Sequence, residues 1–231
     1  MAKKQNQTDP REEQMVAVEQ ALTKTEQFIE NNSKKLTTVI TVVLAIVAVY
    51  FGYSKFVVEP NSKEAAAEMF VAEQQFEAGN YAAALNGDGQ NLGFIEILES
   101  YGNTPTGNLA NYYAGICQLR LGQYSTAIDY LDGFSSSDEI IGAIAKGAIG
   151  DAFAELNQAE EALEYYTTAY KIRDNKFTTP IYMTRAALMC EKLGNYDKAV
   201  SIYTKLRERF PNTNEGRDAE KLLARASSFA K

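Results

Sequence analysis

The chain contains no histidine among its 231 residues, so the commonest general base near neutral pH and the commonest metal ligand are both missing. Its two cysteines, Cys117 and Cys190, are far apart and each lies in an apolar stretch. We expect both to be small buried hydrophobic residues, with a disulfide or metal pair as the alternative. Since the sequence holds no nucleophile motif, phosphate loop or metal-ligand spacing, we expect no catalytic residue, no cofactor and no enzyme activity.

One polar, glycine-rich stretch, residues 86–93, is followed by an apolar segment at 94–101. As a calcium loop it would run from Asp88 through Gly93 to Glu99, but Leu92 would fall where an oxygen ligand is required. We expect instead a loop that breaks a helix and opens a groove, with a new helix over 94–101.

Composition and charge indicate a protein with a hydrophobic core and argue against a nucleic-acid-binding protein. Hydrophobic residues make up 45% and charged residues 23%, which is enough for a core. Residues 1–35 hold six basic and six acidic residues, so the net charge of -7 lies on residues 36–231. An acidic body argues against nucleic-acid binding, which needs a dense Lys and Arg face.

A membrane anchor is predicted at 36–58, because no charged residue lies between Lys35 and Lys55. An aromatic belt at the far interface would consist of Tyr50, Phe51 and Tyr53. A cleaved signal peptide is the alternative, although its apolar part is shorter and nearer the start. A short linker containing Pro60 would follow the anchor.

Flanking lysines predict the orientation of this helix. Three of them precede the anchor and two follow it, namely Lys24, Lys34 and Lys35 before it and Lys55 and Lys63 after it. The bias favours a cytoplasmic N-terminus. In a bacterium, residues 59–231 would then lie in the periplasm and the helix in the inner membrane.

The segment before the anchor, residues 1–35, is predicted to be an amphipathic helical segment, with a helix over 10–32. Its apolar positions recur at steps of three and four residues and are Met15, Val18, Leu22, Thr25 and Ile29. Such a stripe suits self-association in a coiled coil, or a helix on the membrane surface where Phe28 enters lipid. A helix that merely continues the anchor is the third possibility.

Internal repeats dominate the rest of the chain. Four eight-residue copies align, at 78–85, 121–128, 156–163 and 193–200. Their equivalent residues Gly79, Gly122, Asn157 and Gly194 are separated by 43, 35 and 37 residues. These positions are expected to adopt the left-handed conformation that ends the first helix of a hairpin.

Other positions of each copy predict how the two helices pack. Small residues would let them approach closely, namely Ala84, Ala127, Ala162 and Ala199, with Gly115, Gly150 and Ala187 at the crossing. The second helices would begin at Tyr81, Tyr124 and Tyr196. A turn further on, Tyr166 and Tyr203 would pack over their hairpins. Thr179 and Pro180 are expected to be an N-cap and a first helical residue.

These residues resemble the tetratricopeptide repeat family across about residues 64–213. The resemblance implies an all-α superhelix of helical hairpins, with repeats at about 64–101, 107–139, 142–176 and 180–213. Residues 214–231 would be the capping helix that such arrays need. Three features depart from the family: no tryptophan is present, Asn157 replaces glycine, and the first repeat is interrupted.

Repeat superhelices of this family bind proteins on the concave face that their first helices line. The resemblance therefore implies a partner-binding groove whose candidates are Met69, Glu73, Phe76, Tyr112, Ile116, Leu119, Arg120, Asp151, Glu155, Thr184, Leu188 and Glu191. Lys and Asn residues that would clamp a C-terminal carboxylate are missing there. An apolar groove with an acidic rim suits an amphipathic helix or an unfolded segment, with Arg120 as the main cation. Alternatively, half of these residues pack between repeats.

The layout of one N-terminal anchor and three to four repeats is similar to that of the YfgM-like ancillary SecYEG translocon subunit family. This similarity implies an inner-membrane scaffold in protein export or envelope assembly, whose partners are the translocon, secretory chains or a periplasmic chaperone. The alternative is a membrane-bound adaptor with its repeats in the cytoplasm. An enzyme is the third class, and it would need a pocket with paired titratable groups.

Overall fold

The computed structural model describes the backbone of residues 10–230 and the side chains of residues 26–230. It divides into two compact units, 1–57 and 58–231. The predicted stripe at Met15, Val18, Leu22 and Thr25 therefore lies outside the described side chains.

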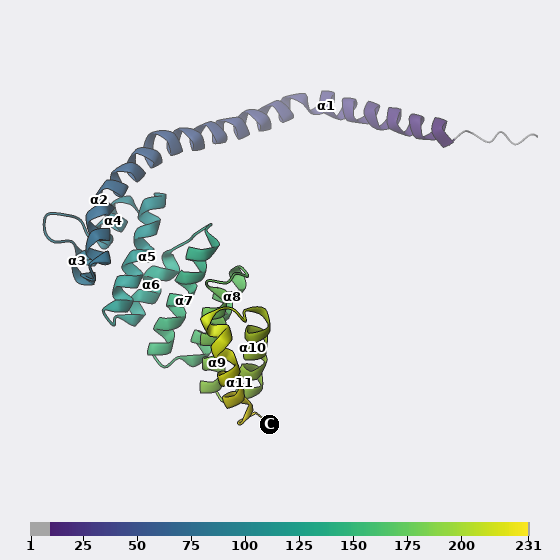
Figure 1. Cartoon of the computed structure of the whole chain (residues 1–231). Helices are drawn as coiled ribbons and strands as arrows, with labels where there is room; N and C mark the ends of the chain where they lie inside the picture. The colour runs from purple at the N-terminus through teal and green to yellow at the C-terminus, as the bar shows by residue number, and fades with distance from the viewer. Residues whose placement is uncertain (1–9, 231) are drawn as a thin grey trace, which may run out of the picture. The chain divides into compact units, whose positions relative to one another are not determined.

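The N-terminal unit contains the helix α1, Pro10–Tyr53, which covers the expected helix at 10–32 and the expected anchor as far as Tyr53 (Figure 1). Its aliphatic and aromatic side chains are exposed; Val49 is 71% and Tyr50 69% accessible. Within Glu26–Glu77 lies the one helical stretch of the described residues that is long and apolar enough to span a membrane.

The expected linker at Pro60 is wrong, because the backbone stays helical there. A π-helical turn, Ser54–Val58, leads directly into α2, Glu59–Glu77, with Pro60 in its first turn. Proline lacks the amide hydrogen that an α-helix needs in its interior, but a first turn does not need it, and a distorted turn commonly precedes it.

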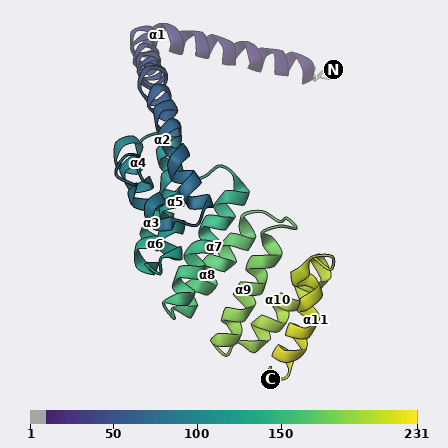
Figure 2. The same ribbon diagram turned by 60° about the vertical axis from the view of Figure 1, so that its left-hand side comes forward.

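The C-terminal unit is an array of helical pairs, and the prediction of an all-α array of helical hairpins is confirmed. The helices after α2 are α3 (Tyr81–Asn86), α4 (Phe94–Tyr101), α5 (Pro105–Arg120), α6 (Tyr124–Gly133), α7 (Glu139–Glu155), α8 (Ala159–Ile172), α9 (Thr179–Lys192), α10 (Tyr196–Arg209) and α11 (Asn214–Ser227). From α4 onward each helix packs against its successor (Figure 2). α11 also packs against α9 and α10, where a capping helix was expected.

Left-handed residues end the first helix of each pair, as predicted. Gly79, Gly122 and Gly194 have φ of 79°, 76° and 74°, and Asn157 is the one described residue other than glycine with positive φ, at 60°. Asparagine tolerates this conformation better than other non-glycine residues, which explains why the turn survives the exchange.

Small residues allow close helix packing at the predicted places. Ala84, Ala127, Ala162 and Ala199 are all fully buried. A Cβ atom on Gly115 would lie 2.5 Å from the Leu131 side chain, and one on Gly150 would lie 2.7 Å from the Tyr166 ring. These distances are shorter than van der Waals contact, so a larger residue would push the paired helices apart.

The predicted N-cap at Thr179 is wrong. Thr179 is already the first residue of α9, and the N-cap residue, Thr178, makes no side-chain capping bond. The Thr179 hydroxyl donates instead to the carbonyl of Arg173 at 2.9 Å, and Asn175 organises the turn. Asn and Thr side chains can form hydrogen bonds with nearby backbone groups in several ways. Here the Thr179 hydroxyl bonds within the turn and not to an amide of the first turn of α9.

Candidate partner-binding groove

A groove of about 580 Å³ crosses the array on the side of its first helices. α5 and α7 supply most of its lining, with contributions from α2, α6, α8 and α9. The lining residues are Phe76, Tyr112, Ile116, Leu119, Arg120, Tyr124, Ile144, Ala148, Asp151, Ala154, Glu155, Tyr166, Tyr182 and Arg185.

The apolar part of the groove comes from two facing helical stripes. Tyr112, Ile116 and Leu119 recur at four- and three-residue steps on α5, so they share one face. Ile144 and Ala148 form the matching stripe on α7. Tyr112, Ile116 and Leu119 also pack on the core cluster of Leu131 and Ile149, which holds the α5 face in place.

A partly buried polar cluster lies at one side of this groove. The Tyr166 hydroxyl donates to the Asp151 carboxylate at 2.7 Å, and Arg185 forms an ion pair with the same carboxylate. The Arg185 guanidinium lies 5.6 Å from the Tyr182 ring centroid and 6.0 Å from that of Tyr166. These bonds bridge α7, α8 and α9, so they fix the groove wall across two consecutive repeats.

Burial shifts the ionisation of the tyrosines in this cluster. It raises the pKa of Tyr182 to about 12. The pKa of Tyr166 is raised by burial first and then by the charge of Asp151. Both rings therefore stay neutral at physiological pH.

Two charged residues on the groove lining, Arg120 and Glu155, are exposed at the ends of α5 and α7. Neither forms an ion pair within the residues that the structure describes. Exposed charges without partners are available to steer a ligand.

The groove brings together seven of the twelve sequence candidates: Phe76, Tyr112, Ile116, Leu119, Arg120, Asp151 and Glu155. Whether they contact a partner stays a prediction. The other five, Met69, Glu73, Thr184, Leu188 and Glu191, do not line this groove, and each has other surroundings.

Two of the five have structural partners, one in the first hairpin and one in the fourth. Met69 is 2% accessible and belongs to the core around Phe94 and Ile97. Thr184 donates its hydroxyl to the carbonyl of Pro180 at 2.9 Å. Glu73 and Leu188 are half-buried, and Glu73 interacts with Tyr113, whose pKa is raised to about 12 by burial and by this carboxylate.

Glu191 has a different structural role, because it anchors the last helix. It accepts a hydrogen bond from the Tyr203 hydroxyl at 2.7 Å and pairs with Arg225 of α11 at 2.8 Å. Its side chain is only 14% exposed. This carboxylate, tyrosine and arginine repeat the arrangement of Asp151, Tyr166 and Arg185, so both clusters tie one hairpin to the next helix.

The sequence interpretation missed Ile144, Ala148 and Arg185 on the groove lining. The first two were within reach, since stepping back from Asp151 by three and seven residues gives Ala148 and Ile144 on the same helical face. Arg185 had no such signal, because its position depends on how α9 crosses α7 and α8.

The loop between α3 and α4 does not contribute to the groove, contrary to expectation. It separates the two helices as predicted, but none of its residues lines the groove. Both oxygens of the Asp88 carboxylate accept local hydrogen bonds, one of them from the backbone amides of Gln90 and Asn91 at 2.9 and 2.8 Å. These bonds lower the pKa of Asp88 and give it a role in holding the turn.

The two cysteines are fully buried, as expected of small hydrophobic residues. Burial raises the pKa of Cys117 to about 12, so its thiol stays protonated.

Comparisons with known proteins agree with this architecture. Tetratricopeptide repeat models match residues 109–137, 143–176 and 183–213. Among 19 similar chains of solved structures, the crystal structure of MamA protein has a TM-score of 0.54 and 16% sequence identity. The match covers 71% of this chain and 87% of that one. No curated protein matches in a sequence search.

The chain therefore contains tetratricopeptide repeats, which are protein-interaction scaffolds and typically have no enzymatic activity. The likeness to MamA, at 16% sequence identity, supports the fold and no functional conclusion. Within the described residues, no group of three or more Cys, Asp or Glu side chains could hold a metal ion.

Proposed function

We propose that this protein is a membrane-anchored scaffold in protein export or envelope assembly, whose groove binds an amphipathic helix or an unfolded segment of a secretory chain. The observation that carries the proposal is the groove between α5 and α7, with apolar stripes on two facing helices and the exposed charges of Arg120 and Glu155 at their ends. An extended or helical segment can place apolar side chains on such stripes and polar side chains at the rim.

Residues 36–58 anchor the protein in the bacterial inner membrane, with the N-terminus in the cytoplasm and the repeats in the periplasm. An exposed apolar helix and the excess of lysine before it support this topology. The single-anchor layout supports a place beside the SecYEG translocon, as an ancillary subunit that contacts emerging chains or a chaperone.

Photo-crosslinking in intact membranes tests the proposed partners. A photoreactive amino acid would replace Ile144, which lines the groove, or Thr168, which is exposed on α8 of the same repeat. We expect the first variant to capture translocon components or secretory chains, and the second to capture far less. Equal capture at both positions would exclude the groove, and capture of cytoplasmic proteins alone would exclude the periplasmic role.

Cysteine labelling tests the topology separately. Since Cys117 and Cys190 are buried, a cysteine placed at the exposed Lys205 would report through an impermeant maleimide. Labelling of intact cells supports periplasmic repeats. Labelling only after the membrane is broken would show that the repeats face the cytoplasm.

A further inference from the structure

The end of α8 and its connection to α9 carry two exposed apolar residues that do not line the groove. Phe177 is 63% accessible and Ile172 36%, on a segment, 171–177, in which Asn175 is the one residue that is not exposed. An exposed aromatic ring offers apolar surface that a partner surface can bury.

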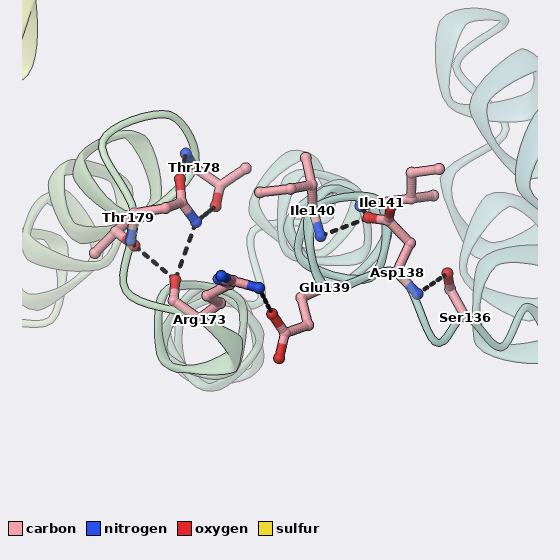
Figure 3. A network of polar contacts seen from close by, with 9 residues as sticks. Ser136, Asp138, Glu139, Ile140, Ile141, Arg173, Thr178 and Thr179 are labelled. Atoms are coloured by element: carbon pink, nitrogen blue, oxygen red, sulfur yellow. Dashed lines mark hydrogen bonds and ion pairs between the residues drawn. The ribbon is translucent and has the colours of Figure 1, made fainter.

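A network of hydrogen bonds holds this turn in one conformation, and Figure 3 shows its Thr178, Thr179 and Arg173 members. The Asn175 side-chain oxygen accepts from the amides of Phe177 and Thr178 at 2.8 and 2.7 Å. Its amide group donates to the Arg173 carbonyl at 3.0 Å and the Thr178 hydroxyl at 2.8 Å. Thr178 and Thr179 are each 1% exposed. Phe177 is therefore held outward by a rigid turn.

The charge of the same segment is positive although the whole chain carries -7. It contains Lys171, Arg173 and Lys176 against one acidic residue, Asp174. Arg173 pairs with Glu139, and Asp174 pairs with Arg209. Among the described residues neither lysine has an ion-pair partner, so both remain available to an anionic surface.

We propose that segment 171–177 docks the repeat unit on an anionic lipid surface, with Phe177 in the interfacial layer and Lys171 and Lys176 beside the phosphates. Aromatic rings favour that layer, and adjacent lysines add electrostatic attraction to anionic lipids. The inference rests on the proposed function, because a membrane-inserted α1 would hold the repeat unit near the lipid surface. Only the π-helical turn Ser54–Val58 separates α1 from the first helix of the repeat unit.

The absence of tryptophan from the chain permits a direct test. Three single-tryptophan variants of the full chain, Phe177→Trp, Phe229→Trp and Ile46→Trp, would be placed in vesicles containing anionic lipids brominated near the headgroup or deep in the acyl chains. Phe229 is 59% accessible, close to Phe177, and serves as the matched control, whereas Ile46 reports the anchor.

We expect headgroup-proximal bromine to quench Phe177→Trp and blue-shift its emission, with Phe229→Trp unaffected. Adding Lys171→Gln and Lys176→Gln should lower the docked population ratio roughly thirtyfold, at about tenfold for each 1.4 kcal/mol. Circular dichroism would verify folding. If bromine quenches the emission of Ile46→Trp but not that of Phe177→Trp, docking is overturned and the proposed anchor stands. If neither emission is quenched, both the docking and the anchor are overturned.

Discussion

At the residue scale, side-chain volume decides how closely neighbouring helices approach. α7 contains three glycines with different surroundings. A Cβ atom on Gly147 would lie 2.0 Å from the Tyr182 ring, one on Gly150 would lie 2.7 Å from the Tyr166 ring, and one on Gly142 would meet nothing within 4 Å. The glycines at 147 and 150 are therefore required for packing, and the one at 142 is not.

Gly147→Ala should destabilise the protein by about 1–3 kcal/mol, because the Tyr182 ring and α9 must move. Gly142→Ala in the same helix should stabilise it by about 0.5–1 kcal/mol, since alanine loses less backbone entropy than glycine. Urea unfolding midpoints of the two variants and the wild type would measure both effects. Equal shifts of the same sign would contradict the proposed crossing at Gly147.

Buried tyrosines predict how stability depends on alkaline pH. Burial raises the pKa of Tyr113 and Tyr182 to about 12, above the value of about 10 in an unfolded chain. As pH rises from about 10 to 12, the unfolded state loses these protons first and is favoured. This contribution to stability is complete below about pH 10 and disappears as pH rises through 12.

Tyr182→Phe should weaken that alkaline loss of stability, because phenylalanine has no proton to release. Urea unfolding at about pH 9 and pH 11.5 would measure the difference for wild type and variant. Parallel losses in both proteins would show that the pKa of Tyr182 is not raised in the folded state.

At the element scale, a partly buried ion pair fastens the last helix to the array. Arg225 of α11 donates to both oxygens of Glu191, at 2.8 and 3.1 Å. Since the Glu191 side chain is 14% exposed, removing its partner leaves a poorly solvated carboxylate. The half-exposed arginine reduces the size of this effect through solvent screening.

Arg225→Ala should therefore cost about 1–2 kcal/mol and act locally, because repeats contact mainly their neighbours. Hydrogen exchange should accelerate in α11 and change little in α7. Lys63→Ala removes an exposed pair with Glu59 within one helix, and it should cost less than about 0.5 kcal/mol. Uniform acceleration throughout the array would contradict a local role for Arg225.

Sequence patterns predicted the hairpins because the features that define them are local. A left-handed residue such as Asn157 and a small residue such as Ala162 have the same task in any pair of helices, so their spacing identifies the fold. Sequence patterns identified only half of the residues that line the groove. Met69 shares a face of α2 with the groove residue Phe76 but packs in the core around Phe94. Glu191 of α9 is held by Arg225 of α11, which follows 34 residues later in the chain.

The same limit explains the errors at helix boundaries. Pro60 and Thr179 each have several satisfactory hydrogen-bonding arrangements nearby, and the choice depends on residues packed around them. Arg185 lines the groove because it contacts Asp151, which lies 34 residues earlier in the chain. No local sequence pattern indicates this contact.

At the scale of the whole molecule, the N-terminal unit supplies an apolar helix, and the C-terminal unit supplies the groove that we propose as the binding surface. Confining a binding site to a membrane raises its effective concentration for partners in the same membrane. A groove of modest affinity then suffices for transient contacts with many chains, which suits the proposed role in export.

The most direct test of this account is a titration of a fluorescently labelled, permanently unfolded secretory protein with the full-length chain in detergent, followed by anisotropy. Ile144→Asp places a charge in the groove, and Thr168→Asp places the same charge on the exposed face of α8 in the same repeat. We predict roughly tenfold weaker binding for Ile144→Asp, as expected when a charge replaces an apolar contact, and wild-type binding for Thr168→Asp. Wild-type affinity in a folded Ile144→Asp variant would contradict the groove as the binding site.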